Sequence, residues 1–310
     1  MKLNEWLDTW ISGYLKHNIK QRSLNTYKHN IINHINPILG EYDMDELTPQ
    51  VLQNFVIEKL EHGNLKSGDK LANNTVISIV NTLKHAIKDA VNMEVTTKDC
   101  TSKIKLPSQE ETKVTAFEKW EQEKIEKYCM NNKDNYIGIV ICLYTGLRIG
   151  ELLALTWDDI DFERNYMTIS KSAYEGEKDG KIQKIVDTPK TKNSNRVIPI
   201  PKQLMEILRH RKKKSKSKYV ITTRYGGMVG TRSFQKTFER ILSKLGIEKK
   251  NFHSLRHTFA TRALEFGMDV KTVSELLGHK SPMITLERYT HSLMSYKTDM
   301  MNKFGKLLSC

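Results

Sequence analysis

The chain has 310 residues, of which 38% are hydrophobic and 28% charged, so it is long enough for two folded domains of ordinary composition. Its formal net charge of +14 at pH 7 suggests a polyanionic partner. The longest apolar run, Tyr136 to Tyr144, is shorter than the about 20 residues that cross a bilayer, so we expect no transmembrane helix, and the N-terminus shows no signal peptide.

The cysteines indicate a reducing compartment. They stand at positions 100, 129, 142 and 310, without a C-x-x-C motif or the spacing of a disulfide framework. We therefore expect a cytoplasmic protein.

Charge is distributed unevenly along the chain. Residues 1–105 hold 13 Lys and Arg against 12 Asp and Glu, whereas the remaining residues hold 37 against 24. A basic protein without a nucleic-acid partner is the simpler alternative, but the asymmetry favours nucleic acid bound mainly by the second part.

Four stretches of 1–105 carry apolar residues at helical spacing. The sequence predicts that the second helix is capped by Ser23, that Thr48-Pro49 opens the third, and that the fourth starts at Asn74 or Thr75. Four amphipathic helices with short connections predict a helical bundle, with its tryptophans in the core.

A linker is predicted next. Ser102 to Lys113 is polar, carries Pro107 and lacks helical periodicity, so we place the linker at 106–114. Thr115-x-x-Glu118 matches a capping box that would open the first helix of a second domain, 115–291.

The second domain begins with a buried helix and an unusual arginine. Tyr136 to Tyr144 is apolar all round, and Thr145-Gly146 interrupts it. Arg148 then stands between two apolar stretches, where a charge is costly unless it is paired or faces solvent. A purely structural ion pair with Glu151 or Asp158 is an equal alternative to a functional role.

Alternating residues predict strands at Tyr166–Ser170, Lys184–Val186 and Arg196–Ile200. We expect the last two to flank a polar hairpin loop, Asp187 to Asn195. The predicted fold is therefore mainly α with a small β-sheet: an N-terminal helical bundle followed by a mixed α+β domain.

The segment from Asn251 to His291 concentrates reactive side chains. It holds His253, Arg256, His279 and Tyr289, a set that suits phosphoryl transfer because it offers a nucleophile, proton carriers and a phosphate-binding fork. His253 and His257 have the spacing of a zinc helix, but Ser254 stands where that motif needs glutamate, so we reject a metalloprotease.

Several motifs in order resemble the tyrosine recombinase, or phage integrase, family. They are T-G-L-R-I-G-E-L-L-A-L at 145–155, H-S-L-R-H-T-F-A from His253, L-L-G-H before Lys280 and R-Y-T-H ending at His291. The motif resemblance covers about 112–291, and the helix pattern of 1–105 resembles the family's core-binding domain. Together the motifs are highly specific.

The resemblance implies a catalytic role for each of six residues. Arg148 and Arg256 would clamp the nonbridging phosphate oxygens with planar, permanently charged forks. Tyr289 would attack phosphorus, His253 would act as acid/base, and His279 would orient the phosphate. A lysine of the polar loop would protonate the departing 5′ oxygen; Lys190 is the best match and Lys192 the runner-up. A 3′-phosphotyrosine intermediate conserves the bond energy, so no cofactor, ATP or metal is expected.

The implied partners are double-stranded DNA recombination sites, a homotetramer that exchanges strands through a Holliday junction, and an accessory directionality factor. The tail 292–310 would dock on a neighbouring protomer. A phage or other mobile element is the expected source. Because the bundle starts near Met1, we expect no separate arm-binding domain, which leaves resolution or inversion open beside integration and excision. A type IB topoisomerase and a noncatalytic DNA-binding protein are the alternatives.

Overall fold

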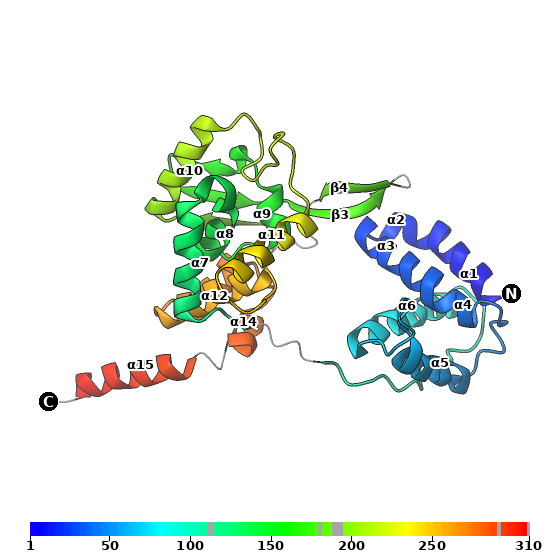
Figure 1. Ribbon diagram of the computed structural model, residues 1–310. Coiled ribbons are helices and arrows are strands. Elements are labelled where there is room, and N and C mark those ends of the chain that lie inside the picture. Colours follow the sequence, from blue (N-terminus) through cyan, green and yellow to red (C-terminus); the bar gives the residue numbers. More distant parts are fainter. Residues whose placement is uncertain (111–114, 179–180, 188–194, 290–292, 309–310) are drawn as a thin grey trace. The chain divides into compact units, whose positions relative to one another are not determined.

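The computed structural model describes residues 1–110, 115–178, 181–187, 195–289 and 293–308. The chain divides into two compact units, Met1–Thr112 and Lys113–Cys310, and each has a hydrophobic core of its own. Both are rich in helices, and the second also carries two small β-sheets (Figure 1). The predicted fold class, mainly α with a small sheet, is confirmed.

Four helical segments form the first unit, as the apolar spacing predicts. The first two segments each contain a π-helical section between α-helical parts. The segments are α1 (Leu3–Thr9), the π section Trp10–Leu15 and α2 (Lys16–Asn18); α3 (Gln21–Asn30), the π section Ile31–Ile35 and α4 (Asn36–Leu39); α5 (Pro49–His62); and α6 (Asn73–Asn92).

The tryptophans of the first unit belong to its core. Trp6 and Trp10 are buried, and their indole N–H groups donate to the Ala86 carbonyl over 2.9 Å and to Asp89 Oδ2 over 2.7 Å, both on α6. They therefore join the first helical segment to the last one, and they are not available for stacking on bases.

Of the predicted N-caps Thr48 and Ser23 in this unit, the first is confirmed and the second is wrong. Thr48 caps α5, since its Oγ1 accepts from the Val51 N–H over 3.2 Å. By contrast, α3 starts at Gln21, and its N-cap is Lys20, three residues before the predicted cap Ser23. The backbone N–H of Ser23 instead donates to the Lys20 carbonyl over 2.8 Å, as a residue inside the first turn does.

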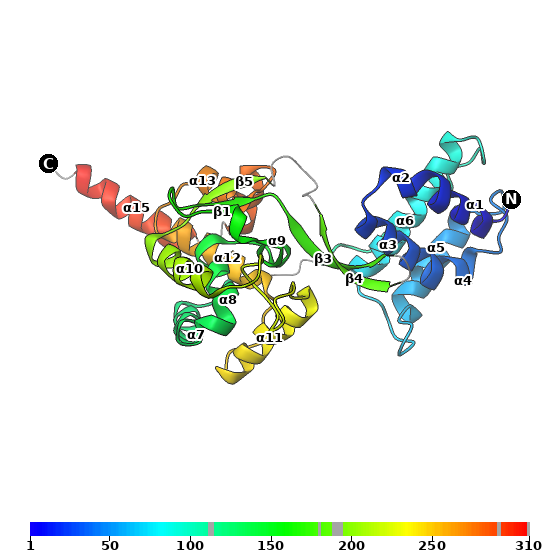
Figure 2. The same cartoon turned by 90° about the horizontal axis from the view of Figure 1, so that it is seen from above.

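The second unit is built around α8, whose residues are buried on nearly every side. Both α7 and α12 lie against α8 (Figures 1 and 2). The helices are α7 (Lys119–Asn131), α8 (Lys133–Thr145), α9 (Ile149–Ala154), α10 (Lys202–Lys214), α11 (Thr231–Lys244), α12 (His253–Glu265), α13 (Val270–Leu277), α14 (Pro282–Tyr289) and α15 (Leu293–Leu308).

The predicted capping box at Thr115 and Glu118 is wrong by three residues. Glu118 is the N-cap of α7, and its N–H donates to the Glu121 carboxylate over 2.8 Å. The Phe117 N–H is bound by Thr258 Oγ1 of α12 over 2.9 Å. That tertiary contact holds the chain ahead of Glu118 outside the helix.

In the part of the chain that the structure describes, five strands form two separate sheets. The antiparallel order β1 (Ile160–Asp161), β2 (Tyr166–Ile169) and β5 (Arg196–Pro199) places Met167 opposite Ile198. Both of these side chains are buried against the helices. The second sheet is a two-stranded arm of β3 (Ser172–Lys178) and β4 (Lys181–Asp187).

The predicted hairpin between the second and third strands is therefore wrong. β4 pairs with β3, which the sequence did not predict, whereas β5 pairs with β2. β4 is paired with β3 along its whole length, from Lys181 opposite Lys178 to Asp187 opposite Ser172, so its backbone is already bonded to a partner other than β5. The start of β3 packs closely on α9, where an added Cβ on Gly150 would lie 2.5 Å from Ser172 Oγ and 2.7 Å from the Ala173 carbonyl.

Candidate active site

Arg148 is placed by a sharp turn between two helices. α8 ends at Thr145, and the next residue, Gly146, adopts the left-handed conformation (φ 64°) that glycine tolerates best. Two residues later Arg148 is the N-cap of α9, and its backbone N–H donates to Glu151 Oε2 over 3.0 Å. Its Nη1 donates to Glu151 Oε1 over 2.7 Å. The structural ion pair that the sequence allowed is therefore present, while the Arg148 side chain stays 38% exposed.

A second arginine, Arg196, approaches the same carboxylate from β5. Its Nη1 and Nη2 donate to Glu151 Oε1 over 3.2 Å and to Oε2 over 2.8 Å. Arg196 and Glu151 are both nearly fully buried. Burial by itself raises the pKa of Glu151, but the hydrogen bond and charge of Arg196, together with the charge of Arg148, outweigh it and hold the pKa at about 2.

Arg256 lies on α12 and is 1% exposed. Its Nη1 donates to the Gly146 carbonyl over 2.9 Å and its Nη2 to the Leu277 carbonyl over 2.6 Å. These carbonyls lie at the C-terminal ends of α8 and α13, where the helix dipoles favour a positive charge. The backbone of two helix ends thus compensates the burial of this guanidinium.

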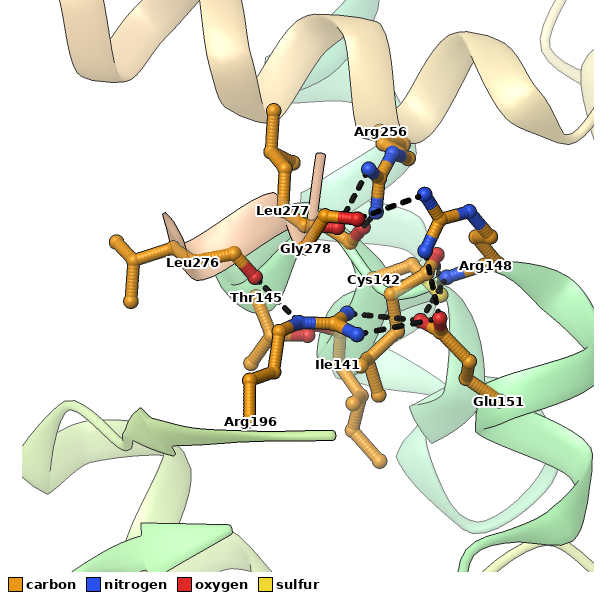
Figure 3. A network of polar contacts seen from close by, with 12 residues as sticks. Ile141, Cys142, Thr145, Arg148, Glu151, Arg196, Arg256, Leu276, Leu277 and Gly278 are labelled. Atoms are coloured by element: carbon orange, nitrogen blue, oxygen red, sulfur yellow. Dashed lines mark hydrogen bonds and ion pairs between the residues drawn. The ribbon is translucent and has the colours of Figure 1, made fainter. Parts of the chain in front are cut away.

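Three arginines meet at the end of α13. Arg196 Nε donates to the Leu276 carbonyl over 2.6 Å, and Arg148 Nη2 donates to the Gly278 carbonyl over 3.4 Å. Together with the bond from Arg256 to Leu277, three consecutive carbonyls accept from three guanidinium groups (Figure 3). Among the described residues, Glu151 is the one carboxylate bonded to any of these three positive charges, so this part of the cluster has an excess of positive charge that suits an anion.

His279 connects this turn to the next helix. It directly follows Gly278, and its Nδ1 lies 2.7 Å from Oγ1 of the buried Thr285 on α14. Tyr289 comes one helical turn after Thr285 and is the last residue of α14; the structure describes its place on this helix and not its side chain.

The remaining predicted residues are distributed as follows. His253 is the first residue of α12, three positions before Arg256, and its ring lies edge-to-face on the buried His257 with centroids 4.9 Å apart. Lys190 and Lys192 lie outside the described residues. Within the described part of the chain, no three His, Cys, Asp or Glu side chains gather as they would around a metal ion.

Sequence reasoning missed Arg196 and Thr285. Arg196 looks like the polar member of an alternating strand, and Thr285 like an ordinary helical threonine. The available signal was Glu151, an acidic residue inside the apolar stretch I-G-E-L-L-A, which needs a buried cation beyond the half-exposed Arg148.

Comparison with known proteins places this chain in a family. The sequence profile of the phage integrase family matches residues 106–295, and that of the phage integrase N-terminal SAM-like domain matches residues 2–60. The tyrosine recombinase XerC-like protein of Caldanaerobacter subterraneus subsp. tengcongensis is 30% identical, over 98% of this chain and 83% of that protein. The chain belongs to the phage integrase family of tyrosine recombinases. This membership supports a DNA cleaving and rejoining enzyme.

Other family members similar to this chain come from mobile elements. The transposase from transposon Tn916 of Enterococcus faecalis is 26% identical, over 86% of this chain and 69% of that protein. The ICEBs1 integrase of Bacillus subtilis is 27% identical, over 91% of this chain and 77% of that protein. These relatives associate the family with DNA integration and mobile elements, as the sequence predicted.

Two solved structures share the fold. The Tn1549 transposon integrase in complex with transposon right end DNA has a TM-score of 0.81 at 20% identity, covering 98% of this chain and all of that chain. A lambda integrase dimer bound to a core site has a TM-score of 0.71 at 20% identity, covering 93% of this chain and 95% of that chain.

In the described residues, no helix is long and apolar enough to cross a bilayer.

Proposed function

We propose that this chain is a site-specific DNA recombinase of a mobile element, with Tyr289 as the nucleophile. One observation carries the proposal: the turn from Leu277 to His279 binds Arg148 and Arg256 through its carbonyls, carries His279, and leads into the helix that ends at Tyr289. Five of the six expected catalytic residues therefore belong to segments that meet at one short turn.

The proposed chemistry is in-line attack on a DNA phosphodiester. Tyr289 Oη attacks phosphorus and transfers its proton to His253, while the bond between phosphorus and the 5′ oxygen breaks. The leaving oxygen takes a proton from Lys190. A 3′-phosphotyrosine link and a free 5′ hydroxyl result, and attack by the 5′ hydroxyl of a partner strand reverses the step.

The arginines would act on the charge of the transition state. A phosphodiester gains negative charge as it becomes pentavalent, so fixed positive charge stabilises the transition state more than the ground state. The half-exposed Arg148 is the guanidinium placed for direct contact. Arg256 is only 1% exposed, so its direct contact with phosphate requires a rearrangement that exposes its guanidinium.

Assembly would involve four copies on two DNA sites. The solved lambda integrase tetramer bound to a Holliday junction, which shares the fold, supports this arrangement. On α15 of this chain, Met301 and Phe304 are 66% and 53% exposed, which offers an apolar surface to a neighbouring protomer. Use of an accessory directionality factor and action in the cytoplasm stay predictions from the resemblance.

The test is a covalent trap. The full chain is incubated with nicked duplexes tiled across the genomic DNA that flanks its gene, and protein that stays attached to DNA in detergent is measured. We expect an adduct with the wild-type chain and with Tyr296→Phe, the matched control that removes a hydroxyl from α15, and none with Tyr289→Phe. An adduct in Tyr289→Phe would place the nucleophile elsewhere.

A further inference from the structure

The pairing of Arg148 with Glu151 poses an electrostatic problem for a phosphate-binding arginine. The carboxylate lies 2.7 Å from Nη1 of Arg148, in a buried position where charge interactions are weakly screened. A lone carboxylate there would cancel the charge that Arg148 offers to a phosphate. The ion pair would then fix the geometry of Arg148 at the expense of its electrostatic effect.

Arg196 resolves this problem. It binds both oxygens of Glu151 in a fork-to-fork arrangement, so Oε1 accepts from Nη1 of both arginines, and Oε2 accepts from Nη2 of Arg196 and the backbone N–H of Arg148. The Arg148–Glu151–Arg196 triad keeps a net charge of +1. Arg196 is 6% exposed in its side chain against 38% for Arg148, so the surplus charge is accessible on Arg148.

We infer that Arg196 is a positioning residue for DNA cleavage: it neutralises and holds Glu151, so that Arg148 keeps both its orientation and its charge for the scissile phosphate. This inference rests on the proposed function and deepens it. The third bond of Arg196, from Nε to the Leu276 carbonyl, ties the same unit to the turn that the other two arginines bind.

The experiment is a charge-compensation cycle on the full chain, with the rate of adduct formation on the same nicked duplexes as readout. Arg196→Met should slow the adduct by about 100-fold, because an unbalanced Glu151 then neutralises Arg148. The double variant Arg196→Met with Glu151→Gln should form the adduct at least about tenfold faster than Arg196→Met alone, because the triad returns to a net charge of +1. Arg240→Met, an exposed arginine on α11, is the matched control and should stay within about twofold of wild type.

DNA affinity and the adduct rate of Glu151→Gln test whether Arg196 has a merely structural role. The affinity of each variant for the duplexes, in a Tyr289→Phe background, should change by less than about threefold, because many phosphates contribute to binding. If Arg196→Met does not fold, Glu151→Gln alone decides: the inference expects its adduct rate to stay within about tenfold of wild type. A loss of about 100-fold there would overturn the inference.

The outcomes separate the two proposals. If the wild-type chain forms no adduct on any duplex, the proposed function fails. If it forms one, while Arg196→Met and the double variant are equally slow or Arg196→Met is as fast as wild type, only the role of Arg196 fails.

Discussion

Burial distinguishes the two arginines of the proposed phosphate clamp. Arg148 is partly exposed and bound mainly to Glu151, whereas Arg256 is enclosed and bound to the backbone at two helix ends. The same substitution should therefore have different consequences at the two positions.

Replacing each arginine with lysine tests this difference. Arg256→Lys should lower the free energy of unfolding by about 1–3 kcal/mol, because one ammonium cannot reach both carbonyls and a buried acceptor loses its partner. Arg148→Lys should change it by less than about 1 kcal/mol. Both should slow adduct formation by at least about tenfold. Denaturant unfolding and the covalent trap measure the two effects, and equal stability of the two variants would contradict the assignment.

Glu151 gives the protein an acid-sensitive contact. Its folded pKa of about 2 lies below the ordinary value of 4.5, so its stabilising effect is complete above about pH 4.5 and is lost as the pH falls toward 2. Between pH 6 and pH 3, the melting temperature of wild type should fall by more than about 4 °C beyond that of Glu151→Gln. Parallel curves for the two proteins would show that Glu151 is not held as an ionised group.

At the scale of the elements, close helix packing fixes the turn before Arg148. A Cβ on Gly146 would lie 2.6 Å from Phe259 Cδ1 and 2.7 Å from Leu277 Cδ2. Gly246 has a similar backbone conformation, with φ 67°, but an added Cβ there meets no atom within 4 Å. A side chain at Gly246 would therefore meet backbone strain alone, whereas one at Gly146 would meet both backbone strain and steric overlap.

Alanine at each glycine makes the comparison. Gly246→Ala should cost about 1–2 kcal/mol through its left-handed conformation alone. Gly146→Ala should cost about 1–3 kcal/mol more, because overlap with α12 and α13 adds to the same strain. It should also slow the covalent trap, since the Gly146 carbonyl binds Arg256. Equal unfolding free energies would mean that the turn relaxes without disturbing the helices.

The elements also show where sequence reasoning succeeds. The apolar spacing of the first unit predicted its four helices, and Thr48-Pro49 marked the start of α5 correctly because a cap is a local interaction. Strand pairing is not local. β3 was missed because S-A-Y-E-G-E-K has weak alternation, and the partner of β5 is β2, whose residues lie about thirty positions earlier.

The candidate site divides in the same way. Arg148, His253, Arg256, His279 and Tyr289 were singled out as candidates because motifs surround them, and their catalytic roles stay predictions. Arg196 was not singled out, because its contacts form only when β5 folds beside Glu151 and the end of α13. A residue whose partners are 45 and 80 positions away leaves no short-range pattern.

At the scale of the whole molecule, the exposed apolar side chains of α15 lead to a prediction about assembly. Met301→Ser with Phe304→Ser should leave the melting temperature of the free protein unchanged, because both side chains are already exposed. If they dock on a neighbour, complexes that join two DNA sites should decrease by at least about tenfold.

Phe266→Ser is the matched control, since Phe266 is 91% exposed at the end of α12. It should alter neither property. Light scattering on duplexes that carry the mapped cleavage site measures complex size. Unchanged synapsis in the α15 variant would refute docking through this surface, and relaxation of plasmids by a monomer would favour a topoisomerase.

The three carbonyls at the end of α13 also have a consequence for biosynthesis. Arg148, Arg196 and Arg256 all precede residues 276–278 in the chain, and each is held by a carbonyl of that segment. A ribosome therefore makes all three arginines before the backbone that aligns them, and Tyr289 follows later still. An unfinished chain that stops before residue 276 therefore carries the three arginines without the turn that holds them and without the proposed nucleophile. Premature termination should therefore yield products that do not break chromosomal DNA.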